Sequence, residues 1–107
     1  MNIETNNQIK STIAQNALLH VIDPEIGLNV VDLGLIYSIH FFEAEKKVQV
    51  TMTLTTQFCP MGESIVSNVT QALESAFKDD AIQVDLIFNP PWSHERISEE
   101  GQQFLNR

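Results

Sequence analysis

The residues that could do chemistry gather around one thiol. Cys59 is the only cysteine of 107 residues, and it lies in the segment TTQFCP, residues 55–60. Residues 48–55 alternate apolar and polar side chains, as a strand with one buried face does, whereas a helical period begins after Pro60. Because proline suits the first position of a helix, this junction predicts that Cys59 is the helix N-cap. Unpaired N–H groups and the helix dipole would favour a thiolate there, able to bind metal or to attack.

A lone cysteine is also consistent with a small buried side chain, because free cysteine is among the most buried residue types. A structural zinc site or an iron-sulfur cluster takes about four protein ligands, which one cysteine cannot supply. A catalytic cysteine normally needs a positioned base, and no motif places His20, His40 or His94 beside Cys59. The sequence therefore predicts a protein that is not an enzyme.

Three other segments carry candidate residues. Asp23 and Glu25 flank Pro24 in a turn, either as functional acids or as solvated carboxylates that end a helix. The segment 29–35 contains an aspartate at 32 expected to cap a short turn, and a glycine at 34 expected to mark a bend or bulge. Trp92 follows two prolines and is expected to be a packing lid or a partner contact.

Composition excludes some classes of function. The net charge of -8, from 14 acidic and 6 basic residues, argues against nucleic-acid binding through phosphates. No stretch approaches the roughly 20 apolar residues of a membrane span, and no secretory leader pattern opens the chain. With a single cysteine no internal disulfide can form, so we expect a reducing compartment, the cytoplasm. The length predicts one domain, residues 1–107.

The periodicity predicts the element order α-β-β-α-β-α. A first helix opens near Asn6 or Asn7, and a second follows Pro60. Strands are expected at 35–42, 48–55 and 82–88, with the first two in an antiparallel hairpin and the last two parallel. The expected fold is α+β, a two-layer α/β sandwich with a small mixed three-stranded sheet and helices packed on one face. The expected buried stripes of the helices are Ile9, Ile13, Ala17 and Val21, then Ile65, Val69, Leu73 and Ala76.

Alternation also assigns the two faces of the sheet. The face toward the helices is expected to carry Leu35, Tyr37, Ile39, Phe41, Val48, Val50, Met52, Leu54, Ile82, Val84, Leu86 and Phe88. The opposite face is mostly polar but includes Ile36, Phe42 and Ile87. These three are expected either to contact another subunit, as in a homodimer, or to be scattered exposed apolar residues.

Taken together, four motifs resemble the PaaD/SufT-type metal-sulfur cluster biosynthesis family, closest to single-domain bacterial SufT-like proteins. They are Asp23-Pro-Glu25, Val31-Asp32-Leu-Gly34-Leu-Ile-Tyr, Thr53-Leu-Thr55-Thr56 before Cys59-Pro60, and Pro91-Trp92. The resemblance spans about residues 18–105. It implies an iron-sulfur assembly domain whose functional site comprises Asp23, Glu25, Thr55, Thr56 and Cys59. The chain departs from the family at Gln57-Phe58, where many members carry a small pair.

The resemblance implies an accessory factor in iron-sulfur protein maturation with scaffold or client proteins as partners. Cys59 would be a transient metal ligand, with no tightly bound cofactor but a transient iron-sulfur cluster or iron. One alternative is an adaptor that recruits clients through Trp92 without binding metal. Another is a PaaD-like component linked to a phenylacetyl-CoA oxygenase, which the absence of a cysteine-rich tail disfavours.

Overall fold

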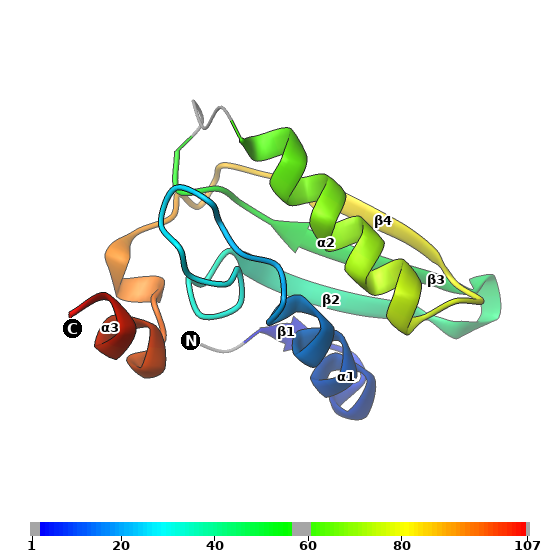
Figure 1. Cartoon of the computed structure of the whole chain (residues 1–107). Coiled ribbons are helices and arrows are strands. Elements are labelled where there is room, and N and C mark those ends of the chain that lie inside the picture. The colour runs from blue at the N-terminus through cyan, green and yellow to red at the C-terminus, as the bar shows by residue number, and fades with distance from the viewer. Residues whose placement is uncertain (1–2, 57–60, 107) are drawn as a thin grey trace.

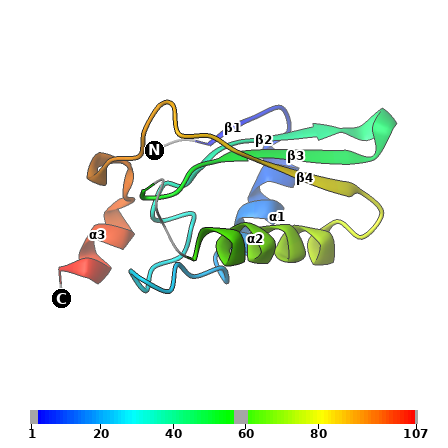
Figure 2. The ribbon, with the colours of Figure 1, turned by 90° about the horizontal axis from the view of Figure 1, so that it is seen from above.

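A computed structural model describes residues 3–56 and 61–106. Helices α1 and α2 lie side by side on one face of the sheet, and α3 lies beyond one end of it (Figures 1 and 2). This arrangement confirms the α+β class. The elements are β1 (Glu4–Thr5), α1 (Gln8–Leu18), β2 (Ile36–Phe42), β3 (Lys47–Met52), α2 (Gly62–Ala76), β4 (Ala81–Leu86) and α3 (Glu99–Leu105), with 3-10 turns at Glu43–Glu45 and His94–Arg96.

The sheet has four strands in the order β1-β2-β3-β4, so the prediction of three strands is wrong. As predicted, β2 and β3 are antiparallel and β3 and β4 are parallel. The additional strand β1 is parallel to β2 and only two residues long, too short to show an alternation. The side chain of Asn6 extends this pairing, because its amide donates to the carbonyl of Phe41 and accepts from the N–H of Phe41, each at 2.9 Å.

The predicted core face of the sheet is confirmed along most of its length. Ile39 pairs with Val50, which in turn pairs with Val84, and all lie toward the helices. The prediction that Ile36 faces away from the helices is wrong, since it is only 1% exposed and lies opposite Met52. A bulge at Tyr37 adds one residue to β2 and places Ile36 opposite Met52. The prediction that Tyr37 faces the helices is also wrong, because its ring lies outside the core cluster and against the guanidinium of Arg96.

The helices differ in how well their buried faces were predicted. In α2, Ile65, Val69 and Leu73 are buried as expected, whereas Ala76, at the last position of the helix, is exposed. In α1 the predicted stripe is wrong, because Ile9 is 78% and Ile13 is 47% exposed. The buried residues of α1 are small or lie one position further along, namely Ser11, Ala14 and Leu18.

The first turn of α1 contacts β2 and the turn that follows it. Asn7 caps the helix by accepting from the N–H of Lys10 at 3.0 Å, as the predicted start requires. The ammonium of Lys10 then pairs with Glu43 at 2.8 Å and lies 5.8 Å from the ring centre of Phe41. With α1 in this orientation, its small residues face the core and Ile9 lies in solvent.

In the described ranges, no helix combines the length and hydrophobicity needed to cross a membrane.

Candidate functional site at the end of the sheet

One end of the sheet collects the segments predicted to carry function. Strands β3 and β4 end there and β2 begins there, because β3 is antiparallel to β2 and parallel to β4. The connection 19–35, the start of α2 and the segment 87–98 lie at the same end in both views (Figures 1 and 2). The described segments that carry the motif residues, 19–35, 53–56 and 87–98, thus lie at one end of the sheet, and the site itself stays a prediction.

Backbone hydrogen bonds carry the strands beyond their regular ends. The N–H of Thr53 donates to Leu35 at 2.8 Å, and that of Ile87 donates to Met52 at 2.9 Å. Thr53 is completely buried, Thr55 is half-buried and Thr56 is exposed. The two threonines of the predicted site therefore lie where the chain leaves the core for the surface.

The two predicted acids occupy different environments. The side chain of Asp23 is 1% exposed, and its Oδ1 accepts from the N–H of Glu25 at 2.9 Å. The Asp23 carbonyl also accepts from the N–H groups of Ile26 and Gly27, which closes the turn. Glu25 is exposed. Asp23 thus shapes the turn, and Glu25 presents its carboxylate to solvent.

The central predicted residue, Cys59, lies outside the described residues, as do Gln57, Phe58 and Pro60. The structure nevertheless corrects one expectation about this junction. Helix α2 begins at Gly62 and its N-cap is Met61, which makes no side-chain capping bond. The prediction that Cys59 caps the helix and that proline opens it is therefore wrong by two residues, and the cap no longer argues for a thiolate.

Trp92 packs against the core and donates its indole N–H to the carbonyl of Leu33 at 2.6 Å. Its ring also lies 5.0 Å from that of His94, centre to centre. Of the two roles predicted for Trp92, the structure supports the packing lid. A direct contact with a partner stays a prediction.

Sequence reasoning missed Arg96, which closes over the same connection. Its Nε donates to the carbonyl of Gly34 at 2.7 Å, and its guanidinium stacks 4.1 Å from the ring centre of Tyr37. The Tyr37 hydroxyl in turn donates to the carbonyl of Pro90 at 2.6 Å. Gly34 has φ +76, and a Cβ there would lie 2.7 Å from the Arg96 Cβ. The expected bend at Gly34 is confirmed, with a steric reason that no sequence pattern shows.

Asp32 joins this connection to α3. One oxygen accepts from the hydroxyl of Ser98 at 2.8 Å and the other from the amide of Asn29 at 2.7 Å. Asn29, through its Oδ1, caps the turn by accepting from the N–H of Asp32 at 2.8 Å. The prediction that Asp32 caps this turn is therefore wrong, because Asn29 is the cap and Asp32 supplies the N–H that it accepts from. Trp92, Arg96 and Ser98, together with the carbonyls and carboxylate they hold at 32–34, are called the C-terminal clamp below.

Carboxylates with lowered pKa values were not among the predicted site residues. Lys10 lowers the pKa of Glu43 through a hydrogen bond and its charge. Hydrogen bonds from Gln49 and Gln83 lower the pKa of Asp85. Within the described part of the chain, no three His, Cys, Asp or Glu residues are grouped as a metal site would require.

Comparison with known proteins identifies the family. The model of the family described as iron-sulfur cluster assembly protein matches residues 12–86. The chain belongs to this family. The match includes every motif of the predicted site except Trp92, and it confirms the resemblance inferred from the motifs.

Individual relatives agree with this membership. The chain is 38% identical to the Fe-S protein maturation auxiliary factor YitW of Bacillus subtilis over 82 residues, 77% of this chain and 79% of the relative. It is 37% identical to the Fe-S protein maturation auxiliary factor SufT of Staphylococcus aureus over 78 residues, 73% and 88% of the two chains. A solved domain of unknown function from Bacillus anthracis has a TM-score of 0.82 at 35% identity, covering 94% of this chain and 98% of that one.

Proposed function

We propose that this chain is an accessory factor in the maturation of iron-sulfur proteins. The observation that carries the proposal is that similar proteins, matched over more than two thirds of their length, are named as Fe-S protein maturation auxiliary factors. Its partners would be scaffold proteins that build clusters and client proteins that receive them. Iron or a cluster is the cargo of such a factor, which has no chemical step of its own to catalyse.

In this proposal Cys59 is the sulfur that transiently ligates the cargo. One thiolate supplies one of the four ligands that an iron-sulfur cluster usually takes, so the other ligands must come from a partner or from a second subunit. Shared ligation makes the bound cargo labile, because each separation of the proteins removes ligands. Lability suits a factor that passes its cargo on.

The acids have distinct parts in this proposal. A carboxylate near a thiol raises the thiol pKa, so Glu25 serves better as a metal ligand, proton acceptor or partner contact than as an activator of Cys59. Glu25 is exposed and free to reach a partner, while Asp23 holds the turn that presents it. Thr55 and Thr56 shape the segment that leads from the sheet to the cysteine.

The proposal is tested by complementation of cells that lack the protein. Cys59→Ser should abolish recovery of iron-sulfur enzyme activity while leaving the free energy of unfolding within about 0.5 kcal/mol of wild type, because the change only exchanges a thiol for a hydroxyl. Anaerobic reconstitution should load iron and sulfide on wild type, either as a pair of copies or with an added scaffold protein, and not on Cys59→Ser. Full recovery by Cys59→Ser would contradict a role for the thiol and favour an adaptor.

The contribution of Glu25 has a matched control in the same chain. Glu25→Gln should give partial recovery, whereas Glu45→Gln, which removes the same charge from the exposed turn between β2 and β3, should recover fully. Equal loss in both variants would mean that overall charge, rather than the position of Glu25, matters.

A further inference from the structure

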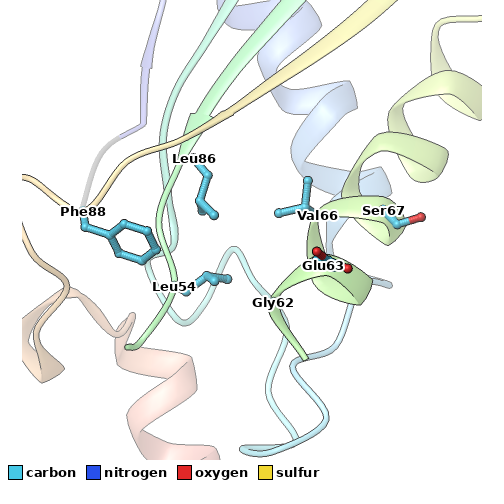
Figure 3. A pocket seen from close by; sticks show the side chains of 7 residues that line it. All are labelled: Leu54, Gly62, Glu63, Val66, Ser67, Leu86 and Phe88. Carbon is cyan, nitrogen blue, oxygen red and sulfur yellow. The ribbon is translucent and has the colours of Figure 1, made fainter. Parts of the chain in front are cut away.

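An apolar pocket lies between the first turns of α2 and the end of β4. Its volume is about 510 Å³, and its lining residues are Leu54, Gly62, Glu63, Val66, Ser67, Leu86 and Phe88. In Figure 3 the side chains of Leu54, Leu86 and Phe88 turn toward the space that faces Val66 of α2. These side chains come from three separate segments, so the pocket exists only in the folded chain.

The pocket leaves apolar surface in water. Leu86 is 40% exposed, the neighbouring Met61 is 39% exposed, and Val66 and Phe88 are half-buried. A contiguous apolar hollow of this kind is characteristic of a binding site, whereas single exposed apolar residues are ordinary. Leu54 directly precedes Thr55, so the pocket adjoins the candidate functional site in the chain.

The charge at the pocket selects its occupant. Glu63 lines it from the first turn of α2, where the helix dipole favours a carboxylate, and no ion pair within the described ranges involves Glu63. Among the residues that the structure describes, the lining contains no Lys, Arg or His. With a net charge of -8 the chain repels acidic segments and attracts basic ones. An apolar group that carries a positive charge beside it satisfies both parts of the pocket.

We propose that this pocket docks a partner protein through a segment in which a large apolar side chain stands next to Lys or Arg. The apolar side chain enters between Leu54, Val66 and Leu86, and the cation pairs with Glu63. The identity of the partner as a scaffold or client rests on the function proposed above. The docking chemistry rests on the pocket alone.

The test uses three capped tetrapeptides as probes, added to the ¹⁵N-labelled full chain without metal and followed by NMR. Their sequences are Gly-Phe-Lys-Gly, Gly-Phe-Gln-Gly and Gly-Ala-Lys-Gly. Gly-Phe-Lys-Gly should shift the amide signals of Leu54, Val66 and Leu86. It should bind about threefold more tightly than Gly-Phe-Gln-Gly, a difference that one exposed ion pair can supply. The alanine peptide should cause no shift at these amides.

Variants assign the two parts of the interaction. Glu63→Gln should make the two phenylalanine peptides bind equally, and its matched control Glu74→Gln, an exposed acid nearer the other end of α2, should keep the threefold difference. Leu86→Ser, which changes a side chain already 40% exposed, should abolish binding of every peptide while the fold persists in the NMR spectrum.

Several results would overturn the proposal. These are equal binding of the lysine and glutamine peptides by wild type, shifts confined to other surfaces, or no binding at all. Shifts of the same amides on raising protein concentration without peptide would assign the pocket to a second copy instead. The two proposals fail separately. Full recovery by Cys59→Ser together with intact peptide binding would contradict only the sulfur function. Failed recovery by Cys59→Ser together with no peptide binding would contradict only the docking site.

Discussion

The C-terminal clamp and the apolar pocket lie at the same end of the sheet and are built in opposite ways. In the clamp, Trp92, Arg96 and Ser98 each donate a hydrogen bond to the connection 32–34, and the contacts are internal to the chain. In the pocket, Leu86 stays 40% exposed and the carboxylate of Glu63 has no ion pair within the described residues. Internally satisfied groups stabilise the fold, whereas unsatisfied apolar and charged surface is available to a partner.

This difference changes the interpretation of Trp92. A large aromatic after two prolines is an attractive candidate for a partner contact when only the sequence is known. Its indole N–H is already bound to the carbonyl of Leu33, and its ring packs on the core. The structure therefore favours the pocket over Trp92 as the docking element, and substitutions in the clamp should act mainly on stability.

Gly34→Ala should cost about 3 kcal/mol of stability, as large an effect as any expected in the clamp. A residue with a side chain costs about 1–2 kcal/mol in the left-handed backbone conformation. The clash of the new Cβ with the backbone of Arg96 should cost about 1–3 kcal/mol more. Gly27→Ala is the matched control, because Gly27 also has positive φ, +83, but nothing lies within 4 Å of its Cβ position. Urea unfolding should show a loss of only about 1 kcal/mol there. Equal losses of unfolding free energy in the two variants would mean that the backbone of Arg96 moves away from the new Cβ at little cost.

Trp92→Ala should cost about 3 kcal/mol, the lower end for such a change, because the side chain is only partly buried. Trp92→Phe keeps most of the packing and should lose about 1 kcal/mol through the unpaired Leu33 carbonyl. Leu86→Ala, the pocket counterpart, should change the unfolding free energy by less than about 1 kcal/mol. The comparison fails if Trp92→Ala leaves urea unfolding unchanged and abolishes partner binding.

The smallest effect concerns Asp85, on the sheet face opposite the pocket. Hydrogen bonds from Gln49 at 2.6 Å and from Gln83 hold its pKa below the usual value. The lowered pKa adds stability that is present above the unfolded value of about 3.9 and is lost as pH falls through the folded pKa. Gln49→Ala should raise the Asp85 pKa, as measured by NMR titration, and its stability deficit should vanish in strong acid. Gln83→Ala should raise the pKa less.

The sequence by itself determined the elements whose signals are local. Alternation in residues 48–52 and 82–86 predicts strands because side chains on a strand point alternately to two faces. Asn7 predicts the start of α1 because its side chain can accept from a free N–H three residues on. The motifs around Asp23, Thr55 and Cys59 predicted the family, and the family match confirms it.

Tertiary structure decided what depends on contacts between distant residues. Strand β1 is held beside β2 by the contact of Asn6 with Phe41, and α1 lies with Ile9 outward and Lys10 paired with Glu43. The bulge at Tyr37 places Ile36 in the core. The first two features depend on contacts between residues more than 30 positions apart, and the third depends on one inserted residue. Neither kind of cause is visible in the local periodicity of the sequence.

The same reason separates the clamp and the pocket from the motif residues. Arg96 is an isolated basic residue in the sequence. Its role is visible only in the folded chain, where it contacts the carbonyl of Gly34, 62 positions away in sequence. Leu54 and Leu86 belong to the alternation that predicts a buried face of the sheet, and Val66 lies next to the predicted buried stripe of α2. Only the way in which α2 leaves the end of β4 uncovered makes a pocket of them. Local patterns thus set where strands and helices form, and the packing of segments distant in sequence decides which of their apolar residues are buried and which remain open to a partner.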